Sequence, residues 1–155
     1  MCIRDSTWPD PDADRGHHDF SYSLYPHAGT WKQALTVHRG YEFNYRLEAE
    51  QLEAHQGILP PRQSFVSASP ENVVLTAMKK ADDGNGLILR FYEWAGRNTD
   101  VQITLPAGAT GAAMVNLMEH SDGSPLTITG GDRISMPIHP FEILTLRVDY
   151  LPHAP

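Results

Sequence analysis

Residues 72–96, NVVLTAMKKADDGNGLILRFYEWAG, decide the fold. Two apolar runs, at 72–80 and 86–94, flank a turn rich in Asp, Gly and Asn at residues 82–86, and this pattern predicts two strands. Both runs carry three consecutive apolar residues, at 73–75 and 87–89. Such runs are typical of central strands covered on both faces, and a docking partner on the second face would explain them.

The same β pattern continues on both sides of this stretch. Val101, Ile103 and Leu105 alternate with polar residues, and Gly- and Asp-rich turns are expected at 121–124 and 130–132. Short strands at this spacing predict a mainly β protein, an antiparallel β-sandwich over residues 64–150. The expected strands are 64–68, 72–80, 86–94, 99–105, 112–119, 125–129, 133–138 and 141–149.

The N-terminal third differs in pattern. Phe20, Tyr22 and Leu24 alternate with serines, which predicts a strand. Thr30 and Gln33 have capping-box spacing and open an apolar stripe with a period near 3.6, so a helix is expected over about 30–45. Residues 1–6 are interpreted as a non-native leader and are excluded from the fold prediction.

Composition excludes several classes of protein. The net charge of −7, without a Lys- or Arg-rich run, argues against a nucleic-acid partner. No apolar run approaches the length of about 20 residues that spans a bilayer, so no membrane partner is expected. The single cysteine, Cys2, cannot form an internal disulfide, and the first residues lack the apolar core of a secretory signal. These features predict a cytoplasmic location.

Five ordered motifs carry a family resemblance. They are DRGHHDFSYSLYPHAGTW (14–31), HQGILPPRQSF (55–65), the stretch 72–96, Asn116-Leu117-x-Glu119, and Pro140-Phe141-Glu142-Ile143. Together they span about 130 positions, which makes the match far more specific than one short motif. The chain resembles the C-terminal β-sandwich region of glycoside hydrolase family 38 α-mannosidases. Departures are modest: Asp82 stands where the family usually has Glu, and Gly40 and Arg46 where it more often has Ala and Pro.

The resemblance implies the fold context and the parent activity. Residues 7–60 would be a strand and a helix from the end of a larger sandwich domain, followed by the terminal sandwich at 64–150. The parent enzyme would hydrolyse α-mannosides with retention of configuration, using two carboxyl groups and a zinc ion held upstream. None of the family's catalytic-domain motifs occurs in this sequence, so we expect no catalytic residue, metal site or cofactor in this chain. The implied partners are the parent's catalytic domain and mannose-containing glycans.

Four residues are candidate sugar or domain contacts. His27 and Trp31 flank the predicted start of the helix, and Tyr92 and Trp94 share one face of a predicted strand. Aromatic rings suit pyranose faces, so a stand-alone carbohydrate-binding module is the alternative function. A buried, hydrogen-bonded His27 at a strand-to-helix corner is the competing interpretation.

Other polar groups are weaker candidates for metal-binding or catalytic sites. His17, His18 and Asp19 lie near Asp10, Asp12 and Asp14, but adjacent histidines on a strand point to opposite faces, so a strand with an acidic loop is favoured over a metal site. Asp82 and Asp83 fit a turn better than a calcium site, which needs more oxygen ligands. The remaining carboxylates are expected on a solvated face, namely Glu42, Glu48, Glu50 and Glu53.

Overall fold

The computed structural model describes residues 15–54 and 56–151. The predicted leader at 1–6 therefore lies outside the described residues, as do Asp10, Asp12 and Asp14. The chain forms two compact units, one ending at Ala34 and the other beginning at Leu35. The second unit contains α1 (Thr36–Asn44) and every strand.

The first unit lacks the predicted strand at Phe20–Leu24. Its described residues contain no strand, and the side chains of Phe20, Tyr22 and Leu24 are 84–88% exposed. A strand needs a neighbour to pair its backbone N–H and C=O groups, and alternation alone does not supply one. The prediction is therefore wrong for the chain as it stands.

The helix is shorter than expected. The capping box forms, since Thr30 N donates to Gln33 Oε1 (2.9 Å) and Gln33 N donates to Thr30 Oγ1 (3.3 Å). The residues after Thr30 make only turns, however, because Leu35 adopts a left-handed conformation (φ 52°) and interrupts the backbone. Gly40 lies inside α1 rather than at its end, a position that costs about 1 kcal/mol relative to alanine and is tolerated.

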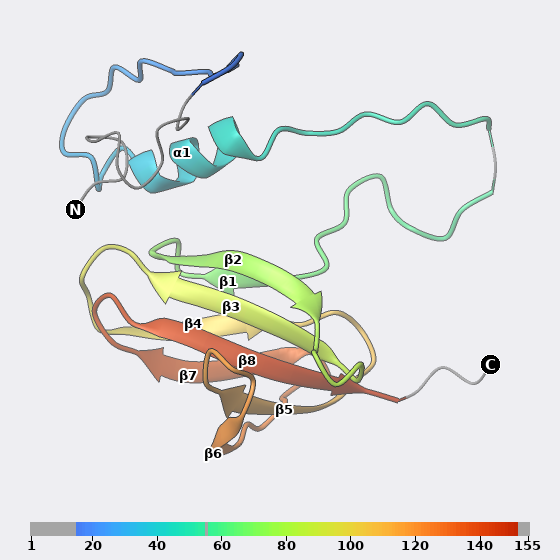
Figure 1. The fold of residues 1–155 in the computed structure, drawn as a ribbon. Helices are drawn as coiled ribbons and strands as arrows, with labels where there is room; N and C mark the ends of the chain where they lie inside the picture. The colour runs from blue at the N-terminus through green and yellow to red at the C-terminus, as the bar shows by residue number, and fades with distance from the viewer. Residues whose placement is uncertain (1–14, 55, 152–155) are drawn as a thin grey trace. The chain divides into compact units, whose positions relative to one another are not determined.

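Two antiparallel sheets make up the sandwich (Figure 1). The three-stranded sheet has the order β1-β4-β7, and the five-stranded sheet has the order β2-β3-β8-β5-β6. The predicted antiparallel β-sandwich is confirmed. The strands are β1 (Ser67–Ser69), β2 (Val73–Lys80), β3 (Leu87–Glu93), β4 (Thr99–Thr104), β5 (Ala109–Val115), β6 (Ser121–Pro125), β7 (Arg133–Ile138) and β8 (Ile143–Tyr150).

The core lies between the two sheets. Side chains alternate along each strand, so one face of each sheet contributes apolar groups to the interior. Phe91 and Leu89 of β3 pair with Leu144 and Leu146 of β8, and all four are 0–1% exposed. Val101, Ile103 and Ile134 complete the opposite layer.

The turn after β5 falls earlier than expected. Residues 121–124, predicted as a turn, lie in β6, and 125–129 is not the sixth strand. The reason is Asn116, whose Oδ1 accepts hydrogen bonds from Met118 N (2.9 Å) and His120 N (3.0 Å). Asparagine side chains that bind the following backbone form turns without glycine, so the chain reverses at 116–120.

The two apolar runs occupy different positions in the sheet. β3 lies between β2 and β8, as expected of a covered strand, whereas β2 is an edge strand and not a central one. The second face of β3 is covered from within the chain, because Ile88 packs with Ala81 and Val115 and is 1% exposed. No docking partner is needed to bury Ile88.

Candidate functional site

Glu93, at the end of β3, is the most enclosed charged group among the described residues. Its side chain is 0% exposed, and its carboxylate accepts four hydrogen bonds. Asn72 Nδ2 (2.8 Å) and Ala95 N (2.8 Å) donate to Oε1, and Gly96 N (2.7 Å) and Phe141 N (3.1 Å) donate to Oε2. Burial alone raises the pKa of a carboxyl, but these bonds outweigh it and leave the pKa of Glu93 below its ordinary value.

This arrangement joins three segments of the chain. Asn72 precedes β2 and also donates to Thr99 Oγ1 (2.7 Å) at the start of β4, while Phe141 lies in the turn between β7 and β8. Both carboxylate oxygens of Glu93 are saturated with N–H donors and the group stays ionised. It is therefore suited to fix loops in place and unsuited to transfer a proton.

Sequence reasoning missed Glu93 as an organising residue, although a signal existed. Strand alternation places Glu93 on the same face as Phe91, which is core. A carboxylate on a core face has to be paired or hydrogen-bonded, so hydrogen-bond donors are expected around Glu93.

Trp94 and Tyr92, two predicted contact residues, lie beneath α1. Trp94 is 5% exposed, and its Nε1 donates to Glu71 O (2.9 Å). His38 of α1 donates to the same carbonyl (2.6 Å) and meets the Trp94 ring edge-on, with 6.0 Å between centroids. Burial, with a smaller contribution from the Tyr41 hydroxyl, raises the pKa of Tyr92 to about 12. The pair anchors the helix to the sheet and presents no open aromatic platform.

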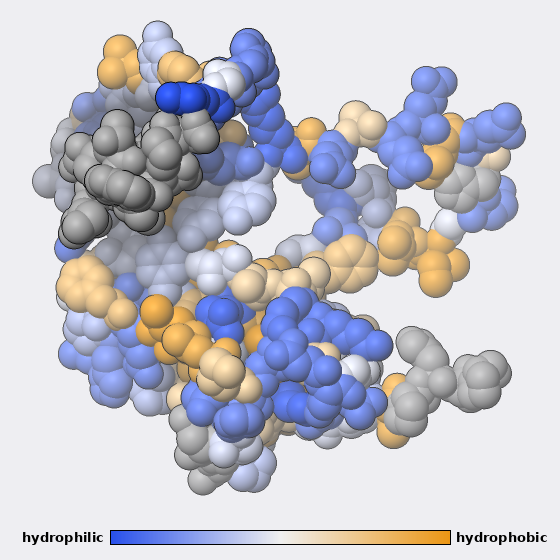
Figure 2. Space-filling view, in the orientation of Figure 1, coloured by the Kyte–Doolittle hydropathy of each residue, from blue (hydrophilic) through white to orange (hydrophobic). Residues whose placement is uncertain are grey.

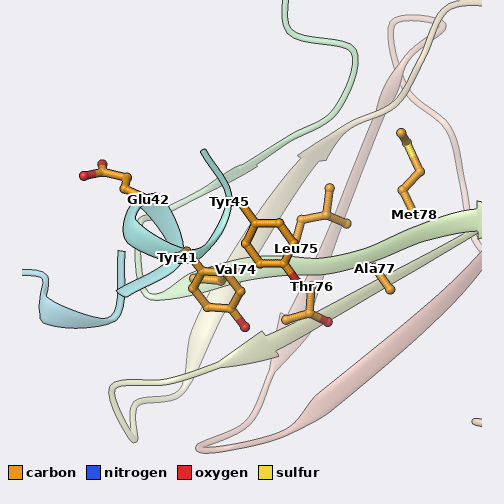
Figure 3. Close-up of a pocket in the computed structure, with 8 residues that line it drawn as sticks. All are labelled: Tyr41, Glu42, Tyr45, Val74, Leu75, Thr76, Ala77 and Met78. Carbon is orange, nitrogen blue, oxygen red and sulfur yellow. The ribbon is translucent and has the colours of Figure 1, made fainter. Parts of the chain in front are cut away.

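An open groove runs between α1 and the edge strand β2 (Figure 3). Its volume is about 390 Å³, and Tyr41 of α1 and Tyr45, which directly follows α1, face residues 74–78 of β2 across it. The two tyrosine rings stack at 5.8 Å. Glu42 is the one carboxylate in the lining, and Arg39 pairs with it at 2.6 Å. The groove can pack apolar groups, but it has no second carboxylate for acid–base chemistry.

The other two predicted residues lie in the first unit. His27 is exposed, with Nδ1 3.3 Å from Ala28 O and its ring 5.5 Å from that of Tyr25. The buried histidine considered as the alternative is therefore not what the structure shows. Trp31 is 47% exposed, and the Lys32 ammonium lies 5.4 Å from the centre of its ring.

The acidic groups considered from sequence that the structure describes have structural partners or are exposed. Asp83 accepts from Asn85 N (2.9 Å) and from Arg147 Nη1 (2.6 Å), and the Arg147 hydrogen bond is the main cause that lowers the pKa of Asp83. Asp82 pairs with Lys79 at 2.5 Å. Glu48, Glu50 and Glu53 are exposed, as expected. Within residues 15–54 and 56–151, no group of three or more His, Cys, Asp or Glu could hold a metal ion.

Comparison with known proteins identifies the sandwich. Residues 72–146 match the family model described as the glycosyl hydrolases family 38 C-terminal beta sandwich domain. Alpha-mannosidase G of Dictyostelium discoideum is 30% identical over 149 residues, covering 94% of this chain and 14% of the relative. Alpha-mannosidase 2C1 of Homo sapiens is 31% identical over 141 residues, covering 89% and 13%.

A relative from yeast is also named an alpha-mannosidase. The alpha-mannosidase of Saccharomyces cerevisiae is 26% identical over 167 aligned positions, covering 94% of this chain and 15% of the relative. The chain thus spans 13–15% of the length of these relatives. In the part of the chain that the structure describes, no helix is both long and apolar enough to cross a bilayer.

Proposed function

Residues 72–146 carry the C-terminal β-sandwich domain of the family 38 glycosyl hydrolases, and on that premise we propose that the chain is a C-terminal, non-catalytic part of an α-mannosidase. The observation that carries the proposal is the coverage: relatives named as alpha-mannosidases align with most of this chain but with only 13–15% of their own length. The parent enzyme hydrolyses α-mannosidic bonds in mannose-containing glycans, and this part supports it by packing against the catalytic domain.

The proposed parent reaction is zinc-dependent and retaining. Retention requires two carboxyl groups about 5–5.5 Å apart around the scissile bond, one of them able to carry a proton. Glu93, the buried carboxylate of this domain, is committed to four N–H donors, and the groove carries one ion-paired carboxylate, Glu42. The residues of this domain therefore have a structural role. The zinc ion and the reacting carboxyl groups belong to the catalytic domain.

An activity assay tests whether hydrolysis requires the upstream catalytic domain. The 155-residue chain and the full product of its gene are each incubated with zinc and an aryl α-mannoside. We expect turnover only from a product that carries the upstream domain. Turnover above background by the chain alone contradicts the proposal, as does a gene with no coding sequence upstream of Asp14.

The proposal extends to residues 7–60 as the end of a larger sandwich domain. Phe20, Tyr22 and Leu24 have strand alternation but no strand partner, and all three are highly exposed. A missing neighbouring strand accounts for both facts. We expect the isolated chain to bind a hydrophobic dye or to aggregate, while the longer product does neither. A monodisperse chain with a single cooperative melt and no dye binding argues against this assignment.

A second candidate function, sugar binding, is favoured by one feature of the first unit. Trp31 and His27 are accessible, and exposed aromatic rings can stack on pyranose faces. Calorimetric titration with mannose and α-mannobiose tests this candidate, with Trp31→Ala as the loss-of-binding variant. The absence of heat at millimolar ligand removes it.

The proposed location is the cytoplasm. One cysteine cannot form an internal disulfide, so the sequence carries no adaptation to an oxidising compartment. Fractionation of the source cells tests the location, and recovery with a secreted or luminal fraction contradicts it.

A further inference from the structure

The outer face of the five-stranded sheet retains an uncovered apolar area at the start of β8. Four large side chains are strongly exposed there: Leu117 (59%), Met118 (73%), Phe141 (67%) and Ile143 (59%). We call these four residues the Phe141 patch. Hydrophobic side chains gather over the start of β8, at the left of the sandwich in the space-filling view (Figure 2).

Backbone pairing and one side-chain hydrogen bond place these residues near the first half of β8. Ile143 begins β8 two residues after Phe141, and it pairs with Tyr92 of β3. Arg90, two residues before Tyr92, pairs with Thr145 and also donates to Leu117 O (3.4 Å). Leu117 and Met118, in the turn after β5, therefore border the beginning of β8.

Phe141 is held in an unusual conformation. Its φ of 60° is in the left-handed region, which is unfavourable for a bulky residue. Glu93 Oε2 accepts its backbone N–H, and its ring lies so close to Gly96 that a Cβ there would come within 2.7 Å of the ring. Glu142 Oε2 accepts from His139 N (2.7 Å) and closes the same turn.

The combination of strain and exposure is informative. A buried carboxylate, a glycine and a turn together fix an aromatic ring that remains 67% exposed. The core does not need that ring, since it buries little of it. Strained residues held by their surroundings concentrate at contact and binding sites.

We propose that the Phe141 patch is the surface on which the preceding part of the family 38 polypeptide docks, through apolar side chains. This inference rests on the proposed function. The matched domain is the family's C-terminal one, and 85–87% of each of the relatives compared lies outside the aligned region (100 minus 15 and 100 minus 13). A covalently linked segment has an effective concentration in the millimolar range, so it outcompetes a second copy for the same apolar surface.

Site-specific photocrosslinking tests the proposal in the full-length gene product. Benzoylphenylalanine replaces Phe141, and in a matched control it replaces Gln102, an exposed residue on the outer face of the three-stranded sheet. We expect a crosslink within one polypeptide, from position 141 to a peptide upstream of residue 15, and at least tenfold less from position 102. Mass spectrometry of the digested product identifies the partner peptide.

Each outcome decides the proposal. A crosslink between two copies, or equal yields at positions 141 and 102, overturns it. If replacement of Phe141 prevents folding, the same probe is placed at Met118, which is 73% exposed in a turn. The same crosslink to a peptide upstream of residue 15 is expected from that position. A gene without an upstream domain refutes the proposed function itself, whereas an active full-length enzyme with no crosslink at 141 or 118 refutes only the docking surface.

Discussion

The outer faces of the two sheets are built differently. On the three-stranded sheet, Ser69, Gln102 and Ser135 pair side by side and are all exposed. On the five-stranded sheet, Ile88 is 1% exposed and Tyr92 is half-buried beneath α1. The first face meets water, as one side of an antiparallel sheet commonly does. The second carries α1, the packing around Ile88 and the Phe141 patch, so the contacts of this domain are concentrated there.

Glu93→Ala should produce the largest effect. The substitution leaves four buried donors without an acceptor, and we expect a loss of about 3–5 kcal/mol in the free energy of unfolding. Urea denaturation measures it. Gln102→Ala, on the water-facing sheet, is the control and should change stability by less than about 0.5 kcal/mol. Equal effects from the two variants would show that Glu93 does not organise its end of the sandwich.

Ile88→Ala tests whether the outer face of the five-stranded sheet is truly interior. We expect a loss of about 2–4 kcal/mol, because the side chain is enclosed by Ala81 and Val115 and its removal leaves a cavity. Ser135→Ala, on the outer face of β7, is the matched control and should be nearly neutral. A neutral Ile88→Ala would mean that solvent reaches both outer faces alike.

Acid should destabilise the protein through the Glu93 cluster. The pKa of Glu93 is lowered in the folded protein, so its contribution is present above the ordinary value of 4.5 and is lost as the pH falls through the folded value. Thermal unfolding as a function of pH should decline less steeply in Glu93→Gln than in the unmodified chain. Parallel curves would contradict this, and Asp83→Asn controls for the exposed carboxylate whose pKa is also lowered.

The sequence was sufficient for the sandwich because alternation and turn residues are local signals. It located seven of the eight strands, while β6 was displaced because Asn116, not Gly123, makes the turn. The five motifs that carry the family resemblance include Asn72, Glu93 and Phe141. The motifs did not reveal what these three residues do in the structure. Alternation places Glu93 on a core face, but two of its donors lie 21 and 48 residues away, and no local pattern predicts which donors it meets.

The predicted contact residues show the same limit. Alternation put Tyr92 and Trp94 on one face, but only the fold reveals that α1 lies over that face, through His38 and Tyr41. The helix begins at Thr36 and not at Thr30 because Leu35 adopts a left-handed backbone conformation, which helix propensity does not predict. Local physics thus predicted the layers, and tertiary contacts decided which surfaces remain open.

His38→Ala should give the smallest effect and separates the helix contact from the sheet. The variant loses the bond from His38 to Glu71 O and the edge contact with Trp94, and we expect a cost of about 1 kcal/mol. Trp94 keeps its own bond to Glu71 O, so the sandwich should stay folded while the ring becomes more exposed. A red shift of tryptophan emission, absent in Asn44→Ala, is the expected result. If the emission is unchanged, Trp94 is buried by the sandwich itself, and the two outer faces differ less than the position of α1 implies.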